Sequence, residues 1–211
     1  SRFYPSAERV QEVLDARRPR HALVQLLYSG VPLRYWTSRF ELCGGSFVEN
    51  TIHMVDLLRF FLGDIYAVSA FYVNPQEGEG PKPMNMPHVY NVNYWFESGV
   101  TANVTTSRVL NNVSISRREF LLISDDSLVE WSEHQVLENG EIILESKGKK
   151  FNAFEAQART FVKAIRKGNP DLMPSPYSVS LNSLAAVLGA NFSAENGGEL
   201  IRLKDFSSEK N

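Results

Sequence analysis

Cysteine is almost missing from this sequence, which has only Cys43 among 211 residues. A single cysteine excludes an intramolecular disulfide and a zinc site built from several thiolates, and it agrees with a reducing cytoplasm. An excess of charge of one sign is missing too, since 22 basic and 24 acidic residues give a formal net charge of -2. No basic face therefore indicates a nucleic-acid partner, and no acidic tail indicates disorder.

Long apolar runs are absent as well. The most apolar stretch, over residues 54–62, is interrupted by Asp56 and Arg59 and is shorter than a membrane span. The first residues lack the apolar run of a signal peptide, so we expect a cytoplasmic protein without a transmembrane helix. Hydrophobic residues nevertheless make up 43% of the sequence. This content is enough for one substantial core, and we expect a single domain over residues 1–211.

Hydrophobic periodicity and turn signals predict the secondary structure. Helices are expected over residues of about 6–17, 46–62, 153–167 and 179–195. Strands are expected over about 21–29, 65–73, 88–96, 100–109, 118–124, 127–132, 134–139, 141–146 and 199–203. The strands in the middle follow one another through short turns such as Asn139-Gly140, which favours antiparallel pairing. The sequence therefore predicts an α+β fold, with a mainly antiparallel open β-sheet and helices packed on one face.

The two closing helices are both expected to be amphipathic. Asn152 and Glu155 resemble a capping box at the start of the first. The apolar faces consist of Phe154, Ala158, Phe161, Val162 and Ile165 in the first helix and of Leu181, Leu184, Leu188 and Phe192 in the second.

The helix over residues 46–62 carries one polar stripe on an otherwise apolar surface. At 100° per residue, Glu49, His53 and Asp56 lie within about 60° of each other. Burying an imidazole and two carboxylates is costly unless they are paired or face a wet cavity, so a cleft or an internal network must lie against the stripe. In a cleft, Glu49 could orient the ring of His53, and the two could act as an acid–base pair.

The same residues allow other interpretations. Ser46 and Glu49 fit the S-x-x-E capping box, in which Glu49 would only close the start of the helix. His53 and Asp56 could form hydrogen bonds with backbone groups in the core. Three ligands at this spacing could also bind a metal ion.

The segment around the stripe, GGSFVENTIHMVDLLRFFLGDIYAVSA, resembles the stretch GGGxxxDxGxHxxDLxxxLxGxxxxVxA of Gfo/Idh/MocA oxidoreductases. In that family the histidine and the acidic residue four positions before it line the active site, beside the nicotinamide and the substrate hydroxyl. The resemblance implies these roles for His53 and Glu49, and a supporting role for Asp56. Glu49 replaces the usual aspartate and Thr51 the usual glycine, which alters the reach of the carboxylate.

The resemblance extends to both ends of the chain. RFYPSAERV is similar to the RFxP segment that follows the crossover from the nucleotide-binding domain, and residues 161–203 are similar to the closing helices and strand. This coverage implies the fold of the family's second domain, which is like the C-terminal domain of glyceraldehyde-3-phosphate dehydrogenase.

Motifs of the nucleotide-binding half are not found in the sequence. No G-x-G-x-x-G follows a predicted strand, and nothing matches the family's E-K-P segment with its lysine. We therefore expect the substrate-binding and oligomerisation domain of an NAD(P)-dependent sugar or polyol oxidoreductase, without a Rossmann domain and inactive alone. NAD or NADP is implied for the full-length parent, and neither a cofactor nor a metal is expected on this chain. The nucleotide-binding domain would be present in cis or in trans.

Two alternative functions are compatible with the same sequence. The chain could be a non-catalytic dimerisation or assembly module that has kept the sheet and lost the enzyme. It could also be a metal-dependent hydrolase that uses Glu49, His53 and Asp56.

Candidate contacts with a small-molecule sugar or polyol lie in the loop before the polar helix. Stacking and charge-assisted hydrogen bonds could come from Arg34, Tyr35, Trp36 and Arg39, although such loop residues also pack on surfaces. The strand over residues 88–96 alternates aromatic and amide side chains, namely Tyr90, Asn91, Asn93, Tyr94 and Trp95. A mixed face of this kind indicates a homo-oligomer interface on the sheet, as the resemblance also implies.

Overall fold

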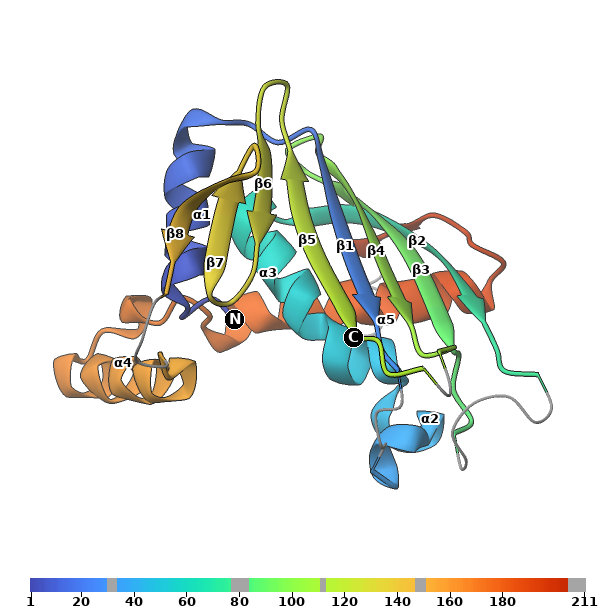
Figure 1. Ribbon diagram of the computed structural model, residues 1–211. Coiled ribbons are helices and arrows are strands. Elements are labelled where there is room, and N and C mark those ends of the chain that lie inside the picture. Colours follow the sequence, from blue (N-terminus) through green and yellow to red (C-terminus); the bar gives the residue numbers. More distant parts are fainter. Residues whose placement is uncertain (30–33, 77–83, 111–112, 147–150, 205–211) are drawn as a thin grey trace.

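The computed structural model describes residues 1–29, 34–76, 84–110, 113–146 and 151–204 (Figure 1). Its helices are α1 (Pro5–Ala16), α2 (Phe40–Cys43), α3 (Ile52–Leu62), α4 (Ala153–Lys167) and α5 (Tyr177–Glu195), with the short turns η1 (Trp36–Ser38), η2 (Phe47–Thr51) and η3 (Pro170–Leu172). Its strands are β1 (His21–Leu27), β2 (Ile65–Val73), β3 (Val89–Phe96), β4 (Thr101–Ser107), β5 (Arg117–Ile123), β6 (Leu128–Trp131), β7 (Gln135–Glu138), β8 (Glu141–Glu145) and β9 (Ile201–Arg202).

One sheet contains all nine of these strands in the order β8-β7-β6-β5-β1-β4-β3-β2-β9. β1 and β4 run parallel, and the other described neighbours pair antiparallel. α1, α3 and α5 lie against one face of the sheet, and no described helix covers the other face (Figure 1). The predicted α+β fold, with a mainly antiparallel open sheet and helices on one face, is confirmed.

Alternation along the strands places the core between the sheet and these helices. In β3, Tyr90, Val92 and Tyr94 are buried, whereas Asn91 and Trp95 are exposed on the open face. The buried side chains join those of α1, α3 and α5 in one apolar cluster, and removing this surface from water is the main favourable contribution to folding. No described helix is both long and apolar enough to cross a membrane.

The face of α5 that packs against the sheet is not the face that carries its large apolar residues, as the sequence had predicted, but the face that carries its small residues. Leu181, Leu184, Leu188 and Phe192 are between 38% and 45% exposed, while Ala186, Gly189 and Ala190 are buried. The reason is close packing: a Cβ on Gly189 would lie 2.8 Å from Cδ2 of Leu203 and 3.2 Å from Cγ1 of Val68. Small residues let the helix approach the sheet, and the large ones form a second apolar face that points outward.

α4 forms over the predicted residues but does not pack on the sheet. Asn152 caps it as predicted, since its Oδ1 accepts a hydrogen bond of 3.1 Å from the backbone N–H of Glu155. Its apolar face is open, however, with Phe154 83% and Ile165 65% exposed, and only Ala164 is buried. Figure 1 shows α4 at the lower left, apart from the sheet.

Candidate functional site

The predicted helix over residues 46–62 begins with the π-helical turn η2 and continues as α3. Two contacts hold its start: the backbone N–H of Ser46 donates to Oη of Tyr90 (3.1 Å), and Nε of Arg108 donates to Oγ of Ser46 (3.0 Å). The backbone N–H of Glu49 donates to the carbonyl oxygen of Gly45 (3.1 Å). Ser46 makes no side-chain cap, so the capping box between Ser46 and Glu49 is not formed.

The π turn changes the spacing of the polar stripe. A turn with i→i+5 hydrogen bonds holds one more residue than an α-helical turn, so the angle assumed between Glu49 and His53 does not apply across it. His53 is exposed and Glu49 is half-buried, and no hydrogen bond between them is found among the described residues. Their action as an acid–base pair therefore stays a prediction, although π turns are frequent at functional sites.

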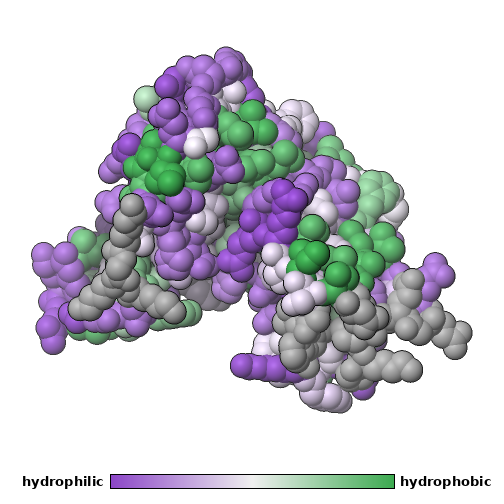
Figure 2. Space-filling model, viewed as in Figure 1, coloured by the Kyte–Doolittle hydropathy of each residue, from purple (hydrophilic) through white to green (hydrophobic). Residues whose placement is uncertain are grey.

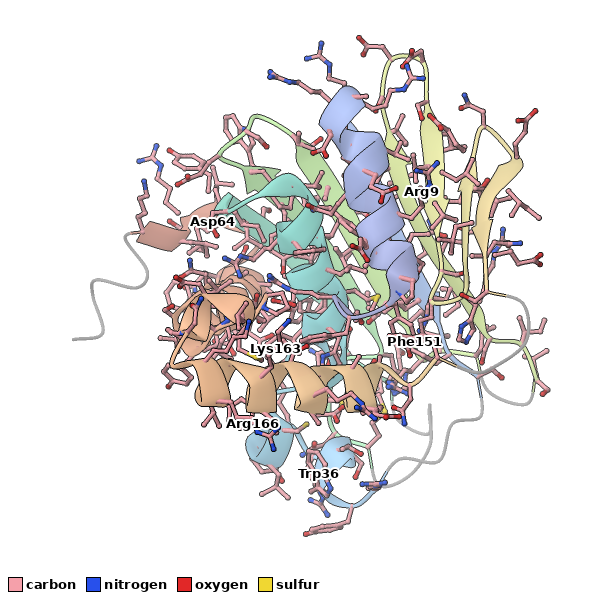
Figure 3. All side chains as sticks on the ribbon, turned by 90° about the vertical axis from the view of Figure 1, so that its left-hand side faces the viewer. Arg9, Trp36, Asp64, Phe151, Lys163 and Arg166 are labelled. Atoms are coloured by element: carbon pink, nitrogen blue, oxygen red, sulfur yellow. The ribbon has the colours of Figure 1, made fainter. Side chains whose placement is uncertain are left out.

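His53 lies at a cavity of about 350 Å³. Tyr28, Asn50 and Asp56 line this cavity together with the N-terminal residues 1–4. α4 crosses below α1 and α3 in Figure 3, and its first residues, among them Phe154, complete the wall. An exposed imidazole at a cavity can exchange a proton with a bound molecule, so the geometry suits acid–base chemistry.

Asp56 takes part in a structural network. Its carboxylate accepts two hydrogen bonds of 2.7 Å from Arg2 and one of 2.8 Å from Oγ of Ser183 on α5. The guanidinium carbon of Arg2 also lies 5.1 Å from the ring centroid of Phe60. Burial alone would raise the pKa of Asp56, but the hydrogen bonds and charge of Arg2 outweigh burial and hold the pKa below its ordinary value. Asp56 thus ties the N-terminal segment and α5 to α3, and its supporting role at an active site stays a prediction.

The metal-binding interpretation required Glu49, His53 and Asp56 to act as ligands on one face. Within the described ranges, no group of three His, Cys, Asp or Glu side chains could hold a metal ion. The carboxylate of Asp56 is already engaged by Arg2 and Ser183. The geometry therefore gives no support to a metal-dependent hydrolase.

The four loop residues predicted to bind substrate, Arg34, Tyr35, Trp36 and Arg39, lie in or beside η1. With α2, η1 forms a projection at the end of the molecule where η2 begins (Figure 1). Trp36 lies on this projection (Figure 3). Its exposed fraction is 45%. The guanidinium carbon of Arg39 lies 5.3 Å from the ring centroid of Tyr35. None of the four lines the cavity at His53, so their contact with a substrate remains a prediction.

Two residues near the candidate site were not singled out from the sequence. Tyr28 follows β1 and Arg108 follows β4, and these two strands are parallel neighbours. The hydroxyl of Tyr28 donates to Oδ1 of Asn50 (3.1 Å), and the guanidinium carbon of Arg108 lies 4.7 Å from the ring centroid of Tyr28. Their sequence signal was a polar or aromatic residue directly after a strand, and it has meaning only once the two strands are known to be neighbours.

The glycine pair before η2 does not form a nucleotide cradle. Gly44 and Gly45 have φ values of 71° and 91°, in the left-handed region that favours glycine. A Cβ on Gly45 would lie 3.0 Å from Oη of Tyr90 and 3.1 Å from Cε2 of Phe40. The side chains of Phe40 and Tyr90 leave little room for even a methyl group at Gly45, so a phosphate does not fit at this position.

A family model described as the GFO/IDH/MocA C-terminal domain matches residues 16–122. The chain belongs to the GFO/IDH/MocA family. The matched range includes β1, the π turn, α3 and the strands through most of β5. The resemblance noted in the sequence is confirmed by this match. No curated protein matches this GFO/IDH/MocA domain in sequence.

Three solved structures with the same fold are those of oxidoreductases. An oxidoreductase from Thermotoga maritima has a TM-score of 0.80 at 18% identity, covering 97% of this chain and 61% of its own. One from Agrobacterium radiobacter, in complex with NAD+, L-tartaric acid and magnesium, has a TM-score of 0.76 at 15% identity, with coverages of 97% and 63%. The aldose-aldose oxidoreductase from Caulobacter crescentus, complexed with glycerol, has a TM-score of 0.76 at 18% identity, with coverages of 95% and 61%. The GFO/IDH/MocA domain thus spans less than two thirds of these proteins.

Proposed function

We propose that this domain is the substrate-binding and oligomerisation part of an NAD(P)-dependent sugar or polyol oxidoreductase. The observation that carries the proposal is His53, which belongs to the family motif and lies exposed at a cavity. Relatives of the same fold are complexed with L-tartaric acid and with glycerol. Both are small polyhydroxylated molecules, which supports a substrate of this class.

The chain's own contribution to the reaction is proton transfer and positioning. The His53 imidazole accepts the proton of a substrate hydroxyl during oxidation and returns it during reduction. Asn50 and Tyr28, which are hydrogen-bonded to each other at the same cavity, orient the substrate. The hydride acceptor belongs to a nucleotide-binding domain, because no G-x-G-x-x-G follows a strand in this sequence.

α4 offers a surface on which such a domain could dock. Its exposed apolar face includes Phe161 and Ile165, at 54% and 65% exposure. An apolar stripe on a helix normally packs against another element, and α4 has no sheet beneath it. The same helix lines the cavity at His53 through Phe154, so a domain docked here would lie beside that cavity.

The open face of the sheet suits association of two copies. Asn103 Nδ2 donates to Oδ1 of Asn91 and of Asn93, both at 2.9 Å, and forms an amide ladder across β3 and β4. Exposed aromatic side chains flank the ladder, with Phe71 59% and Trp95 48% exposed. Figure 2 shows apolar patches on this face separated by a polar band. Aromatic residues combined with hydrogen-bonding groups are common in protein interfaces.

Calorimetry of the isolated chain tests the prediction that this chain does not bind the nucleotide by itself. Titration with NADH and with NADPH is expected to give no saturable binding below about 1 mM, which corresponds to about 4 kcal/mol of binding free energy. A Kd in the micromolar range for either nucleotide would contradict the proposal, because the chain would then hold the cofactor by itself.

Sedimentation velocity with two matched variants separates the two apolar surfaces. Trp95→Lys should convert the self-associated chain to monomers, because it places a charge in the proposed interface. Ile165→Gln should leave the association of the two copies unchanged, because the apolar face of α4 is the proposed binding surface for the nucleotide-binding domain. A chain that is monomeric from the start, or one that dissociates only with Ile165→Gln, would contradict this assignment.

A further inference from the structure

Backbone hydrogen bonds fix the position of Arg108 near the candidate site. Its backbone N–H donates to the carbonyl oxygen of His88 (2.8 Å), and that of Tyr28 donates to the carbonyl oxygen of Ser107 (2.9 Å). Because β1 and β4 are parallel neighbours, Tyr28 and Arg108 leave the sheet side by side, at the end where η2 and α3 begin.

The side chain of Arg108 is also supported on two sides. Its guanidinium carbon lies 4.7 Å from the ring centroid of Tyr28, a cation–π contact. Its Nε donates to Oγ of the buried Ser46 (3.0 Å). These contacts use the inner nitrogen and one face of the guanidinium. The two terminal nitrogens make no hydrogen bond with any residue in the described ranges.

Among the described residues, Arg108 lacks the carboxylate partner that two more deeply buried arginines have. Arg2 and Arg59, whose side chains are 7% and 4% exposed, pair with Asp56 and Asp64. Arg108 is half-buried and forms no ion pair with any described carboxylate. Burial lowers its pKa, opposed only in part by nearby acidic groups such as Tyr28 and Glu49. A half-buried guanidinium that lacks an ion-pair partner gains from a ligand that supplies a carboxylate.

We propose that Arg108 binds a carboxylate of the substrate, which narrows the substrate class to sugar acids and polyhydroxy acids. This rests on the proposed function. Arg108 does not itself line the cavity of His53, but it lies against Tyr28, which lines the cavity and is hydrogen-bonded to Asn50 there. Two terminal nitrogens in one plane match the two oxygens of a carboxylate. The negative charge of Glu49 acts on the same guanidinium and favours a monoanion over a phosphate dianion.

NMR titration of the 211-residue chain with gluconate and glucitol tests the proposal. The two molecules have the same six-carbon polyol framework and differ in the carboxylate. Gluconate is expected to shift the guanidinium signals of Arg108 and the imidazole signals of His53, with a Kd at least tenfold lower than that of glucitol. Arg108→Gln should remove this preference for gluconate. Arg108→Lys should keep part of it, because an ammonium group retains the positive charge but not the two parallel N–H donors of a guanidinium.

Controls distinguish ligand binding from a structural role. Arg117→Gln, which removes an exposed arginine paired with Glu119, should leave the preference for gluconate unchanged. Ser46→Ala removes only the support at Nε and should weaken gluconate less than Arg108→Gln does. The thermal midpoint of each variant shows whether it is folded.

Each other outcome has a defined meaning. If gluconate and glucitol both shift His53 with equal affinity, or if Arg108→Gln keeps the preference, the carboxylate assignment is wrong while the proposed function stands. Tighter binding of glucose 6-phosphate than of gluconate would overturn the choice of a carboxylate. If none of the three shifts His53, both the proposed function and the role of Arg108 are wrong.

Discussion

Replacing Asp56 by alanine is expected to lower the free energy of unfolding by about 3 kcal/mol, since removal of one partner strands a buried charge. The side chain of Arg2 is 7% exposed and would lose both hydrogen bonds to the carboxylate. Ser183 on α5 would lose its acceptor as well. For a chain of this length the change corresponds to a fall in Tm of about 6–12 °C, measured by calorimetry or circular dichroism.

The contribution of Asp56 depends on pH in a definite direction. Its pKa is lowered in the folded chain because the hydrogen bonds and charge of Arg2 outweigh burial. Such a group stabilises the fold fully above the unfolded-state pKa, about 3.9 for aspartate, and loses this effect as the pH falls through the folded-state pKa. Urea unfolding should therefore show the largest difference between the unmodified chain and Asp56→Ala at neutral pH, narrowing below about pH 4.

Asp126→Ala provides the matched control. Asp126 also pairs with an arginine, Arg17, but its side chain is 64% exposed. Exposed ion pairs contribute between 0 and about 1 kcal/mol, so this variant should unfold close to the unmodified chain. Equal losses for the two variants would show that Arg2 finds another partner and that Asp56 is not the tether we describe.

Replacing His53 by alanine is expected to reduce kcat/KM by a factor of about 10²–10⁴ in a protein that joins this chain to its nucleotide-binding domain. The loss follows from the proposed role of the imidazole, which takes the proton of the substrate hydroxyl. The variant should keep its Tm, because the side chain of His53 is exposed and makes no hydrogen bond with another described residue. Steady-state rates and a melting curve on the same preparation give both values.

His21→Gln is the control for this variant. His21 lies at the start of β1, at the opposite end from Tyr28, and its Nδ1 is 2.8 Å from Oγ1 of Thr101. Its replacement should leave kcat/KM within about twofold. A His53 variant that retains full activity would remove the basis for the proposed mechanism.

Most of the fold could be predicted because its signals are local. Period-two alternation identified the strand β3 but not its buried side, because Tyr90 and Tyr94, which we grouped with the predicted interface face, are buried in the core and only Asn91, Asn93 and Trp95 are exposed. Asn152 predicted the start of α4 because a cap involves neighbouring residues only. The signal that decides which face of α5 packs against the sheet is not local. Its small residues at Ala186, Gly189 and Ala190 are buried because Val68 and Leu203 lie close enough to exclude anything larger.

The candidate site was predicted less completely for the same reason. The family motif placed His53 and Asp56 on one helix, and the structure puts both at one cavity. The position of Glu49 depends on the π turn, which accompanies contacts of Ser46 with Tyr90 and Arg108. These partners are 44 and 62 residues away in sequence, so periodicity within the helix could not reveal them.

By itself, the sequence determined the α+β class, the order of the elements and the helix with Glu49, His53 and Asp56, because periodicity, caps and turns depend on neighbouring residues. Only the tertiary structure decided which polar groups are already satisfied. Asp56 is bound by Arg2 across 54 residues, whereas Arg108 lies against Tyr28 without a carboxylate partner among the described residues. Pairing of charges depends on which distant segments the sheet brings together, and one linear pattern does not contain that information.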